Sequence, residues 1–225
     1  MKIENTWTFN IDNAIRASGF PMKTKIEHNR IEQADIDRAT KLASVPSGTG
    51  HDTWLKGCLV SCDITAPQYW WLQWQRYHFH DIVSSQSKMH RITKMDLYTQ
   101  CNKYVHPTLI ELLKGMIDQY NRQDITSDYR KRLFQQIMSN CPMGLELTAG
   151  TVTNYLQLKS IYGQRRHHRL EEWQTYCDWI ESLPMMTTIL EVEQMNKKKT
   201  ARDLQTFLLD CTGLELIDEE DDFEQ

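Results

Sequence analysis

Three of the seven tryptophans of this chain crowd into one short segment, which constrains the fold more than any other part of the sequence. Residues 66–80 read Ala-Pro-Gln-Tyr-Trp-Trp-Leu-Gln-Trp-Gln-Arg-Tyr-His-Phe-His. Large aromatic side chains dominate the energetics of protein cores, so this segment must pack against the rest of the molecule. Gln73, Arg76 and the serine-rich stretch at 84–87 lie among or just after them. Such a mixture is typical of a site for a planar, anionic ligand.

The overall composition bounds the size and class of the protein. The chain has 225 residues, of which 40% are hydrophobic and 25% are charged. This is enough to bury a core as one large domain or two small ones, and it disfavours wholesale disorder. We expect one domain over residues 1–215, followed by a disordered acidic tail over residues 216–225.

Charge and cysteine usage indicate where the protein works. The net charge of −4 gives no general reason to expect binding to nucleic acid or to a membrane surface. No stretch approaches the roughly 20 apolar residues that a membrane helix needs. The six cysteines form no C-x-x-C pair, which is typical of reduced thiols in a core. The first residues lack the apolar run of a signal peptide, so we expect a cytoplasmic protein.

Hydrophobic periodicity predicts a mixture of strands and helices. Apolar residues alternate from Cys58 to Ile64, which predicts a strand over residues 55–64 with one buried face. A weaker alternation predicts a strand over residues 7–11. Spacing close to 3.6 residues and flanking Gly or Pro predict helices over residues 13–19, 107–120, 129–138 and 200–211.

The aromatic segment itself has the features of a helix start. Thr65 can cap the first turn, and a proline two residues later suits it, so we expect a helix over residues 65–77. Gln73 and Arg76 are three residues apart and would share a face of that helix. Residues 79–92, rich in Ser and His, are expected to be irregular.

The longest periodic run covers residues 151–183 and stops before Pro184. If it is one helix, Asn154 and Arg165 are three turns apart and project from the same face. Such a row could face a ligand, with Arg165 holding an anion. Taken alone, Arg165 is better explained as a side chain that reaches from the edge of the core to solvent.

Other chemistries find less support in the sequence. His78 and His80 could contribute to a metal site, but no partner motif accompanies them, so we expect no metal. The serines at 84–87 lack the Gly-x-Ser-x-Gly pattern, and no G-x-G-x-x-G or Walker sequence is present. The basic run at 164–169 invites an RNA-binding interpretation, but the apolar stripe that continues through it favours a solvated helix face.

The order of these motifs resembles the flavin-dependent thymidylate synthases. That family carries the signature R-H-R-x-x-S-x-N-E-x-S-x-R after a proline-led helix with a glutamine three residues before the first arginine. Here Gln73 and Arg76 fit that entry into the signature. The resemblance extends over roughly residues 50–183. Its other matching pieces, in order, are His51-Asp52-Thr53-Trp54-Leu55, Cys141-Pro142, Leu147-Thr148, Thr151-Val152-Thr153-Asn154 and Arg165.

The chain departs from the signature at several positions. With one inserted residue, Ser87 matches the motif serine, whereas Ser85 stands in place of the glutamate. The remaining departures are Tyr77 for the histidine, His78 for the second arginine, Met89 for the last arginine (with Lys88 adjacent) and Ser160 for a frequent second asparagine.

The resemblance implies an α+β fold with a central, mainly antiparallel sheet flanked by helices, called the thymidylate synthase complementing fold. The implied reaction is methylation of dUMP at C5, with methylenetetrahydrofolate as carbon donor, FAD as hydride carrier and NADPH as reductant. The implied assembly is a homotetramer with shared sites. The residues implied to face the nucleotide are Gln73, Arg76, Ser85, Gln86, Ser87, Lys88 and Arg165, with Arg165 and Arg76 catalytic; those implied to approach the flavin are His51, Thr53, His78, Phe79, Asn154 and Ser160.

Two alternatives stay open at the level of the sequence. The altered signature could serve a related transfer, such as hydroxymethylation of a pyrimidine deoxynucleotide. Alternatively, the chain could keep the fold as a binding protein for a nucleotide or, less favoured, for a nucleic acid through Arg165, Arg166 and Arg169. A steep salt dependence would mark nucleic-acid binding, because phosphate contacts release counterions.

Overall fold

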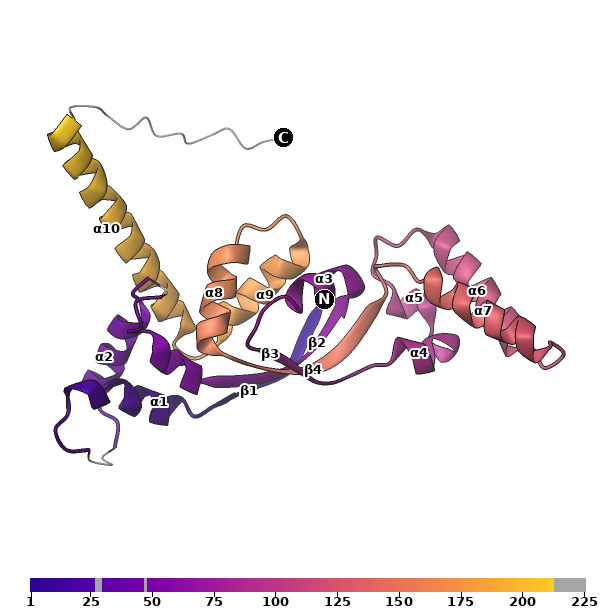
Figure 1. Ribbon diagram of the computed structural model, residues 1–225, viewed down its shortest axis with the longest axis horizontal. Helices are drawn as coiled ribbons and strands as arrows, with labels where there is room; N and C mark the ends of the chain where they lie inside the picture. The colour runs from indigo at the N-terminus through magenta and orange to yellow at the C-terminus, as the bar shows by residue number, and fades with distance from the viewer. Residues whose placement is uncertain (27–29, 47, 213–225) are drawn as a thin grey trace.

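A four-stranded antiparallel sheet forms the centre of the molecule (Figure 1). The structure is a computed structural model that describes residues 1–26, 30–46 and 48–212. The strands lie in the order β1-β2-β4-β3, and every neighbouring pair is antiparallel. The predicted α+β fold is therefore confirmed. The strands are β1 (Lys2–Phe9), β2 (Leu59–Pro67), β3 (His80–Ser85) and β4 (Glu146–Asn154).

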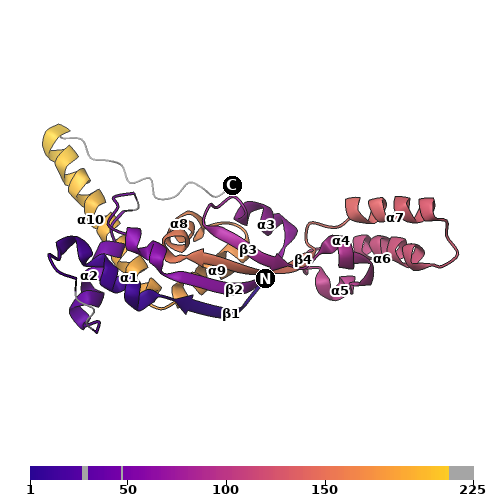
Figure 2. The same ribbon diagram turned by 60° about the horizontal axis from the view of Figure 1, so that its bottom comes forward.

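Helices cover one face of the sheet and extend it at both ends (Figures 1 and 2). Helices α3, α8 and α9 lie over the sheet, α1 and α2 lie at one end, and α4 to α7 lie at the other. Helix α10 runs outward from the body. The helices are α1 (Ile11–Ser18), α2 (Gln33–Ala43), α3 (Gln68–Trp74), α4 (Lys88–Arg91), α5 (Leu97–Gln100), α6 (Pro107–Asn121), α7 (Ser127–Ser139), α8 (Tyr155–Arg165), α9 (Glu171–Ser182) and α10 (Met186–Thr212), with 3-10 turns at Phe20–Met22, Thr53–Gly57 and Ile92–Lys94.

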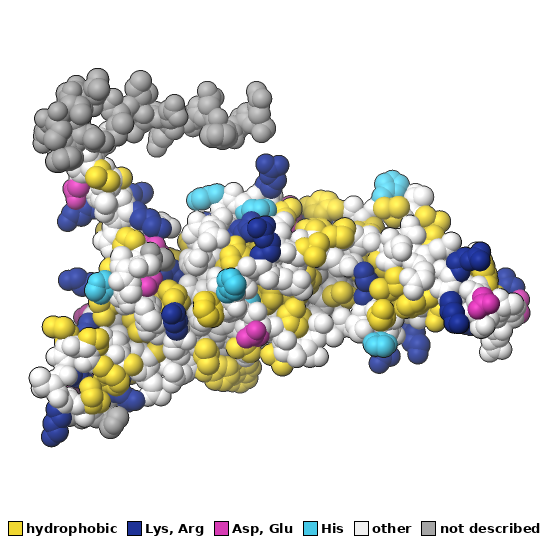
Figure 3. All heavy atoms as spheres, in the orientation of Figure 1, with side chains coloured by type: hydrophobic (Ala, Val, Ile, Leu, Met, Phe, Trp, Pro, Cys, Tyr) yellow, Lys and Arg dark blue, Asp and Glu magenta, His cyan; other side chains and the backbone are white. Residues whose placement is uncertain are grey.

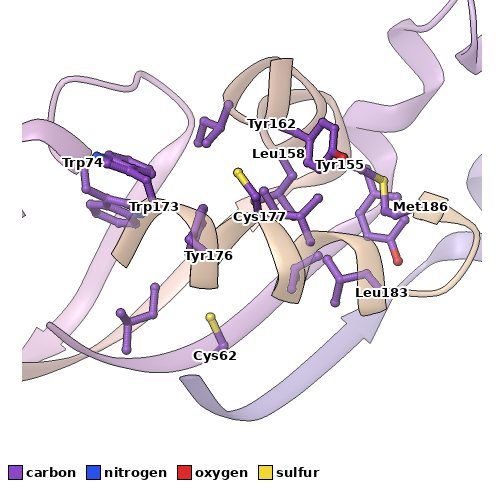
Figure 4. Packing of buried hydrophobic residues seen from close by; sticks show 14 of the residues in the cluster. Cys62, Trp74, Tyr155, Leu158, Tyr162, Trp173, Tyr176, Cys177, Leu183 and Met186 are labelled. Carbon is purple, nitrogen blue, oxygen red and sulfur yellow. The ribbon is translucent and has the colours of Figure 1, made fainter. Parts of the chain in front are cut away.

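The main core lies between the sheet and the helices that cover it. Alternate residues of β2, from Val60 to Ala66, are buried beneath α3, α8 and α9. The aromatic segment supplies Trp70 and Trp74, which pack against aromatic residues of α9 (Figure 4). Burial of such rings, at about 25 cal/mol per Å² of apolar surface, is what holds α3 and α9 on the sheet.

The other face of the sheet keeps large apolar side chains exposed. Trp7 is 64% exposed, and Phe9 and Leu59 are about half exposed. Phe9 pairs with Leu59 across β1 and β2, so the two side chains lie on one face. A separate, smaller core joins α5, α6 and α7 at the far end of the sheet. It contains Ile92, Leu97, Ile110, Leu113, Ile117, Ile137 and Leu145.

Several sequence predictions are confirmed by the structure. The predicted helices over 107–120 and 129–138 are α6 and α7, and the predicted helix over 13–19 is α1, shifted by two residues. The alternating segment is β2, although residues 53–57 form a 3-10 turn before it. The strand expected at 7–11 is β1, which begins earlier and ends at Phe9. The helix expected at 200–211 is the outer part of α10.

Three predictions are wrong. Thr65 does not cap a helix: it lies in β2, where its hydroxyl bonds that of Thr148 at 2.7 Å, and α3 begins only at Gln68 and ends at Trp74. The segment 79–92 is not irregular, because it contains β3 and α4. The run 151–183 is not one helix, because it holds the end of β4, then α8, then α9.

The acidic tail at 216–225 lies outside the described residues, and the single domain over 1–215 stays a prediction. No helix in the part of the chain that the structure describes is both long and apolar enough to cross a membrane.

Candidate functional site

Arg165 lies in a cage built from three helices. Its guanidinium stands over the ring of Trp173, at 4.7 Å from the ring centroid. Its Nε donates to the hydroxyl of Tyr77 at 2.8 Å, and its Nη1 donates to Oε1 of Gln73 at 3.4 Å. The same Gln73 oxygen accepts from Nε1 of Trp173 at 2.9 Å. We call Gln73, Tyr77, Arg165 and Trp173 the Arg165 cage.

The aromatic core fixes the position of this cage. Trp173 is fully buried and packs against Trp70 of α3, with ring centroids 5.0 Å apart. Gln73 projects from α3 toward α9, so its amide is fixed by the same packing. Arg165 is the last residue of α8, where a cation interacts favourably with the negative end of the helix. Cage residues that are far apart in sequence thus meet because three packed elements end at one place.

The cage holds an unneutralised positive charge. Among the described residues no carboxylate lies in ion-pair range of Arg165, and its hydrogen-bond partners are neutral oxygens. The pKa of nearby His168 is lowered by burial and then by Arg165 and Arg169. The neighbouring Arg166 differs, since it forms ion pairs with Asp178 and Glu181. Arg165, unlike Arg166, is therefore prepared to meet an anion or a polarised carbonyl oxygen.

His80 lies in the aromatic core behind the cage. It is only 9% exposed, and its ring centroid is 4.2 Å from that of Trp74 and 6.1 Å from that of Tyr77. Neither ring nitrogen has a hydrogen-bond partner among the described residues. Burial lowers the pKa of His80 to about 3, so the imidazole is neutral at physiological pH. No group of three His, Cys, Asp or Glu among the described residues could hold a metal ion.

The end of the edge strand β3 and the start of α4 are joined by the 85–88 segment, which consists of Ser85, Gln86, Ser87 and Lys88. Gln86 extends the pairing of β3 with β4. Its side-chain Oε1 accepts from the backbone N–H of Thr148, and its backbone N–H donates to the Thr148 carbonyl, both at 2.9 Å. Ser87 caps the short helix α4. Lys88 Nζ donates to Oε1 of Gln68 at 2.9 Å.

Two hollows flank the 85–88 segment. One, of about 400 Å³, lies between α3 and the β3–β4 edge and has an apolar wall that includes Trp71, Leu72 and Leu147. The other, of about 710 Å³, is shallow and is lined by Ser85, Gln86, Ser87, His90, Arg91, Lys94 and Met95. Both volumes fall in the range of small-molecule sites, and the second is rich in cationic and hydroxyl groups.

A third hollow contains part of the predicted flavin set. It has a volume of about 370 Å³, and its lining includes Thr53, Phe79 and Ser160. A buried ion pair, Lys159 Nζ to Asp52 Oδ2 at 3.1 Å, ties the loop at its rim to α8. Lys159 also donates to the carbonyl of Val45 at 2.7 Å. Removing one partner of such a pair costs about 3–5 kcal/mol, so this rim is firmly held.

The predicted site residues thus form separate groups within one chain. Gln73 and Arg165 are in direct contact, whereas Arg76 lies beyond the end of α3, is exposed and makes no side-chain hydrogen bond with a described residue. Asn154 is not on a helix face with Arg165: it ends β4, and its side chain caps α8. His51 and His78 are exposed, and His51 is adjacent to the rim residue Asp52.

Three important residues were missed in the sequence. Trp173 and Lys159 fell in a periodic run that predicted only a helical stripe, and nothing in the sequence pairs Lys159 with Asp52. Tyr77 was noted only as a departure from the signature. Its position between Gln73 and the histidines was the one signal available for a role near Arg165.

The fold has well-matched counterparts among solved structures. The flavin-dependent thymidylate synthase ThyX from Helicobacter pylori complexed with FAD and dUMP aligns with a TM-score of 0.63 and 11% identity, over 84% of this chain and 97% of the other. A second crystal structure of that protein with FAD and dUMP gives 0.66 and 10%, over 86% and 99%. The UMP/dUMP methylase PolB from Streptomyces cacaoi, bound with 5-Br dUMP, gives 0.60 and 10%, over 86% and 94%.

These matches establish that the chain has the fold of the flavin-dependent thymidylate synthases. The fold expected from the motif order is therefore confirmed. The sequence matches no protein-family model, and no curated protein matches it. At 10–11% identity the likeness carries the fold alone, so the activity must be argued from the residues of this chain.

Proposed function

We propose that this protein is a flavin-dependent transferase that adds a one-carbon group at C5 of a pyrimidine deoxynucleotide. The proposed reaction is the conversion of dUMP to dTMP, with methylenetetrahydrofolate, FAD and NADPH. The contact between Gln73 and Arg165 is the observation that carries it. These residues are 92 positions apart, were both assigned to the nucleotide by the resemblance, and meet in a fold shared with proteins crystallised with dUMP.

The Arg165 cage has the chemistry needed to bind a uracil ring. A guanidinium without a carboxylate partner can donate to a carbonyl oxygen of the ring and stabilise negative charge that develops there during attack from C5. Trp173 and Gln73 hold it in place, so little reorganisation is required. The four cage residues include no Ser, Thr, Cys or Lys, and the proposed chemistry needs no protein nucleophile, because orientation and electrostatics are the protein's contribution.

The 85–88 segment is the proposed phosphate side of the nucleotide site. Ser87 and Lys88 supply a hydroxyl and a cation beside a hollow that also contains Arg91 and Lys94. Arg76 is exposed and free to reach an anion. Register shifts between Ile82 and Ser84 leave one extra residue in β3, within the stretch where the signature needs an insertion. This bulge supports the alignment that places Ser87 on the motif serine.

The hollow near Thr53, Phe79 and Ser160 is the proposed flavin side. Phe79 offers an exposed aromatic face, and the hydroxyls offer hydrogen bonds to a polar ring edge. When bound, the flavin would supply a hydride equivalent to the carbon being transferred. With about 370 Å³, the hollow fits a ring system better than a whole dinucleotide. The residues therefore fit part of FAD, together with His51, His78 and Asn154 nearby.

A homotetramer would complete the site. Gln73 faces α9, whereas Leu72 and Gln75 of the same helical region line the hollow beside the 85–88 segment. The two groups of nucleotide residues therefore lie on different faces of α3. A shared site requires a second copy to bring them together. The exposed apolar face with Trp7, Phe9 and Leu59 provides surface of the kind that such assemblies bury.

Product analysis tests the proposed reaction. The purified protein would be incubated with dUMP, methylenetetrahydrofolate, FAD and NADPH, and the nucleotides separated and weighed by mass spectrometry. A product heavier by a methyl group supports dTMP formation. A product heavier by a hydroxymethyl group would instead assign hydroxymethylation. The two products must be distinguished because Ser85 replaces the glutamate of the signature. Unchanged dUMP under all donor combinations contradicts the proposal.

A further inference from the structure

The hydroxyl of Tyr77 is placed between two side chains of α8. It accepts from Nε of Arg165 at 2.8 Å and donates to Oε1 of Gln164 at 3.2 Å. Gln164 in turn donates through Nε2 to the hydroxyl of Ser160 at 3.3 Å. Both hydrogen-bonding functions of the phenol are therefore used. A hydroxyl that both donates and accepts a hydrogen bond is fixed in orientation, so it holds its partner side chains in one arrangement.

Three contacts define the plane of the guanidinium. Tyr77 holds Nε, Gln73 holds Nη1, and Trp173 lies under the face. Nη2 of Arg165 has no acceptor among the described residues, and this atom is not fully buried. It is therefore open to solvent and available to a ligand. Of the two hydrogen bonds, the one that Tyr77 accepts is the shorter, at 2.8 Å against 3.4 Å for the one that Gln73 accepts.

We propose that Tyr77 is the positioning residue of Arg165: its hydroxyl fixes the guanidinium so that the Nη2 side is presented to the ligand. The identity of that ligand as a pyrimidine nucleotide rests on the proposed function, whereas the contact itself does not. Tyr77 stands where the resembling signature has a histidine. A shorter imidazole is also an acceptor, so this chain has exchanged one neutral acceptor for another with a longer reach.

The ring and the hydroxyl of Tyr77 have separable roles. The ring packs near Trp173 and His80, with centroids 6.0 Å and 6.1 Å away. A Tyr77→Phe substitution keeps this packing and removes only the hydroxyl. Tyr98→Phe is a matched control, because Tyr98 also bonds a side chain through its hydroxyl, to Glu111 on α6, and is distant from α8 in the fold.

Exchange of the Arg165 Nε proton tests the positioning without any ligand. In a proton–nitrogen spectrum, the Arg165 Nε–H signal, assigned by its loss in Arg165→Lys, is expected to exchange slowly. Tyr77→Phe should accelerate its exchange by about tenfold or more, as expected for loss of a hydrogen bond to a charged group. Tyr98→Phe should leave it unchanged. An unchanged rate in Tyr77→Phe overturns the proposal.

A double-mutant cycle with dUMP tests the consequence for binding. Tyr77→Phe should weaken dUMP binding by about tenfold in the natural chain, but by no more than about twofold in an Arg165→Met background. Tyr77→His should recover part of the affinity. Equal weakening in both backgrounds means that Tyr77 acts independently of Arg165 and overturns the proposal. If the natural chain binds no dUMP, the proposed function fails, and proton exchange still decides the role of Tyr77.

Discussion

The Arg165 cage and the 85–88 segment show two different degrees of preparation for a ligand. In the cage, the side chains of Gln73, Tyr77 and Arg165 each bond a neighbour from another part of the chain, and Trp173 is fully buried. In the segment, the side chains are exposed or half-buried, and Gln86 is occupied by the backbone of Thr148. A single chain therefore preorganises the base-binding half of the proposed site, whereas the phosphate-binding half is not yet fixed by neighbouring groups.

Removing Trp173 should have the largest effect on stability. Trp173→Ala would leave a cavity in the aromatic core and lower the free energy of unfolding by about 3–5 kcal/mol. Met89→Ala, which truncates a residue 58% exposed beside the segment, should change it by no more than about 0.5 kcal/mol. Urea denaturation of both variants measures the difference. Similar losses of unfolding free energy would mean that the two regions are equally well packed, which contradicts the difference between them.

Removing Arg165 should have the largest effect on ligand binding and turnover. Arg165→Ala is expected to weaken dUMP binding or lower turnover by about 100-fold, as for loss of a key charge-stabilising donor. Arg166→Ala should change either by no more than about threefold, because Arg166 is already paired with Asp178 and Glu181. Isothermal titration with dUMP measures both. Equal effects would instead favour a binder that uses the whole basic run, and a steep salt dependence would identify nucleic acid.

His80 should make the stability of the cage region depend on pH. Its folded pKa lies near 3, below the ordinary 6.5, because burial disfavours the cation. The unfolded chain therefore takes up a proton below about pH 6.5 that the folded chain refuses until about pH 3, so stability is lost as pH falls through that window. The loss should reach about 1.4 kcal/mol per pH unit.

Denaturation at a series of pH values would isolate this contribution. His80→Phe retains an aromatic ring in the same packing, so its unfolding free energy should fall less steeply between about pH 6 and about pH 4. The slope difference from the natural chain should approach about 1 kcal/mol per pH unit, with the remaining histidines common to both. Identical slopes would mean that His80 titrates normally and that the aromatic pocket admits water.

The smallest effect is expected in the 85–88 segment. Lys88→Ala should weaken dUMP binding by only about three- to tenfold, because a half-buried cation near the surface contributes little and salt screens it. Lys88→Arg should restore the affinity. Titrations at low and high salt would show whether the loss shrinks as ionic strength rises. A loss of affinity as large as that of Arg165→Ala would mean that the 85–88 segment is preorganised as well as the Arg165 cage, which contradicts the difference between the two regions.

The sequence predicted what periodicity and motif order can encode. Helices α6 and α7 have one apolar stripe each, and β2 has one buried face, so their patterns are unambiguous. Strand β3 was missed because it is an edge strand with both faces largely exposed, which removes the alternation. The order of His51, Gln73, Asn154 and Arg165 was sufficient to predict the fold.

The cage itself could not be predicted from one sequence. The residues at 151–154 belong to β4 but contain only one hydrophobic side chain, Val152, so no alternation separates them from the helical pattern that starts at Tyr155. That error placed Asn154 and Arg165 on one helix face. The contact of Trp173 with Arg165 depends on the turn after α8, which folds α9 back toward α3, and the contact of Tyr77 depends on how α3 packs beside α8. Neither arrangement has a signal in the sequence.

A flavin titration would show directly whether flavin and pyrimidine nucleotide share one site in this protein. The visible spectrum of the protein with FAD would be recorded near neutral pH before and after addition of dUMP, with Arg165→Ala in parallel. We expect a bound-flavin spectrum that shifts when dUMP is added to the natural chain but does not shift when dUMP is added to the variant. A protein that takes up no FAD, or whose flavin spectrum ignores dUMP, would contradict a shared site.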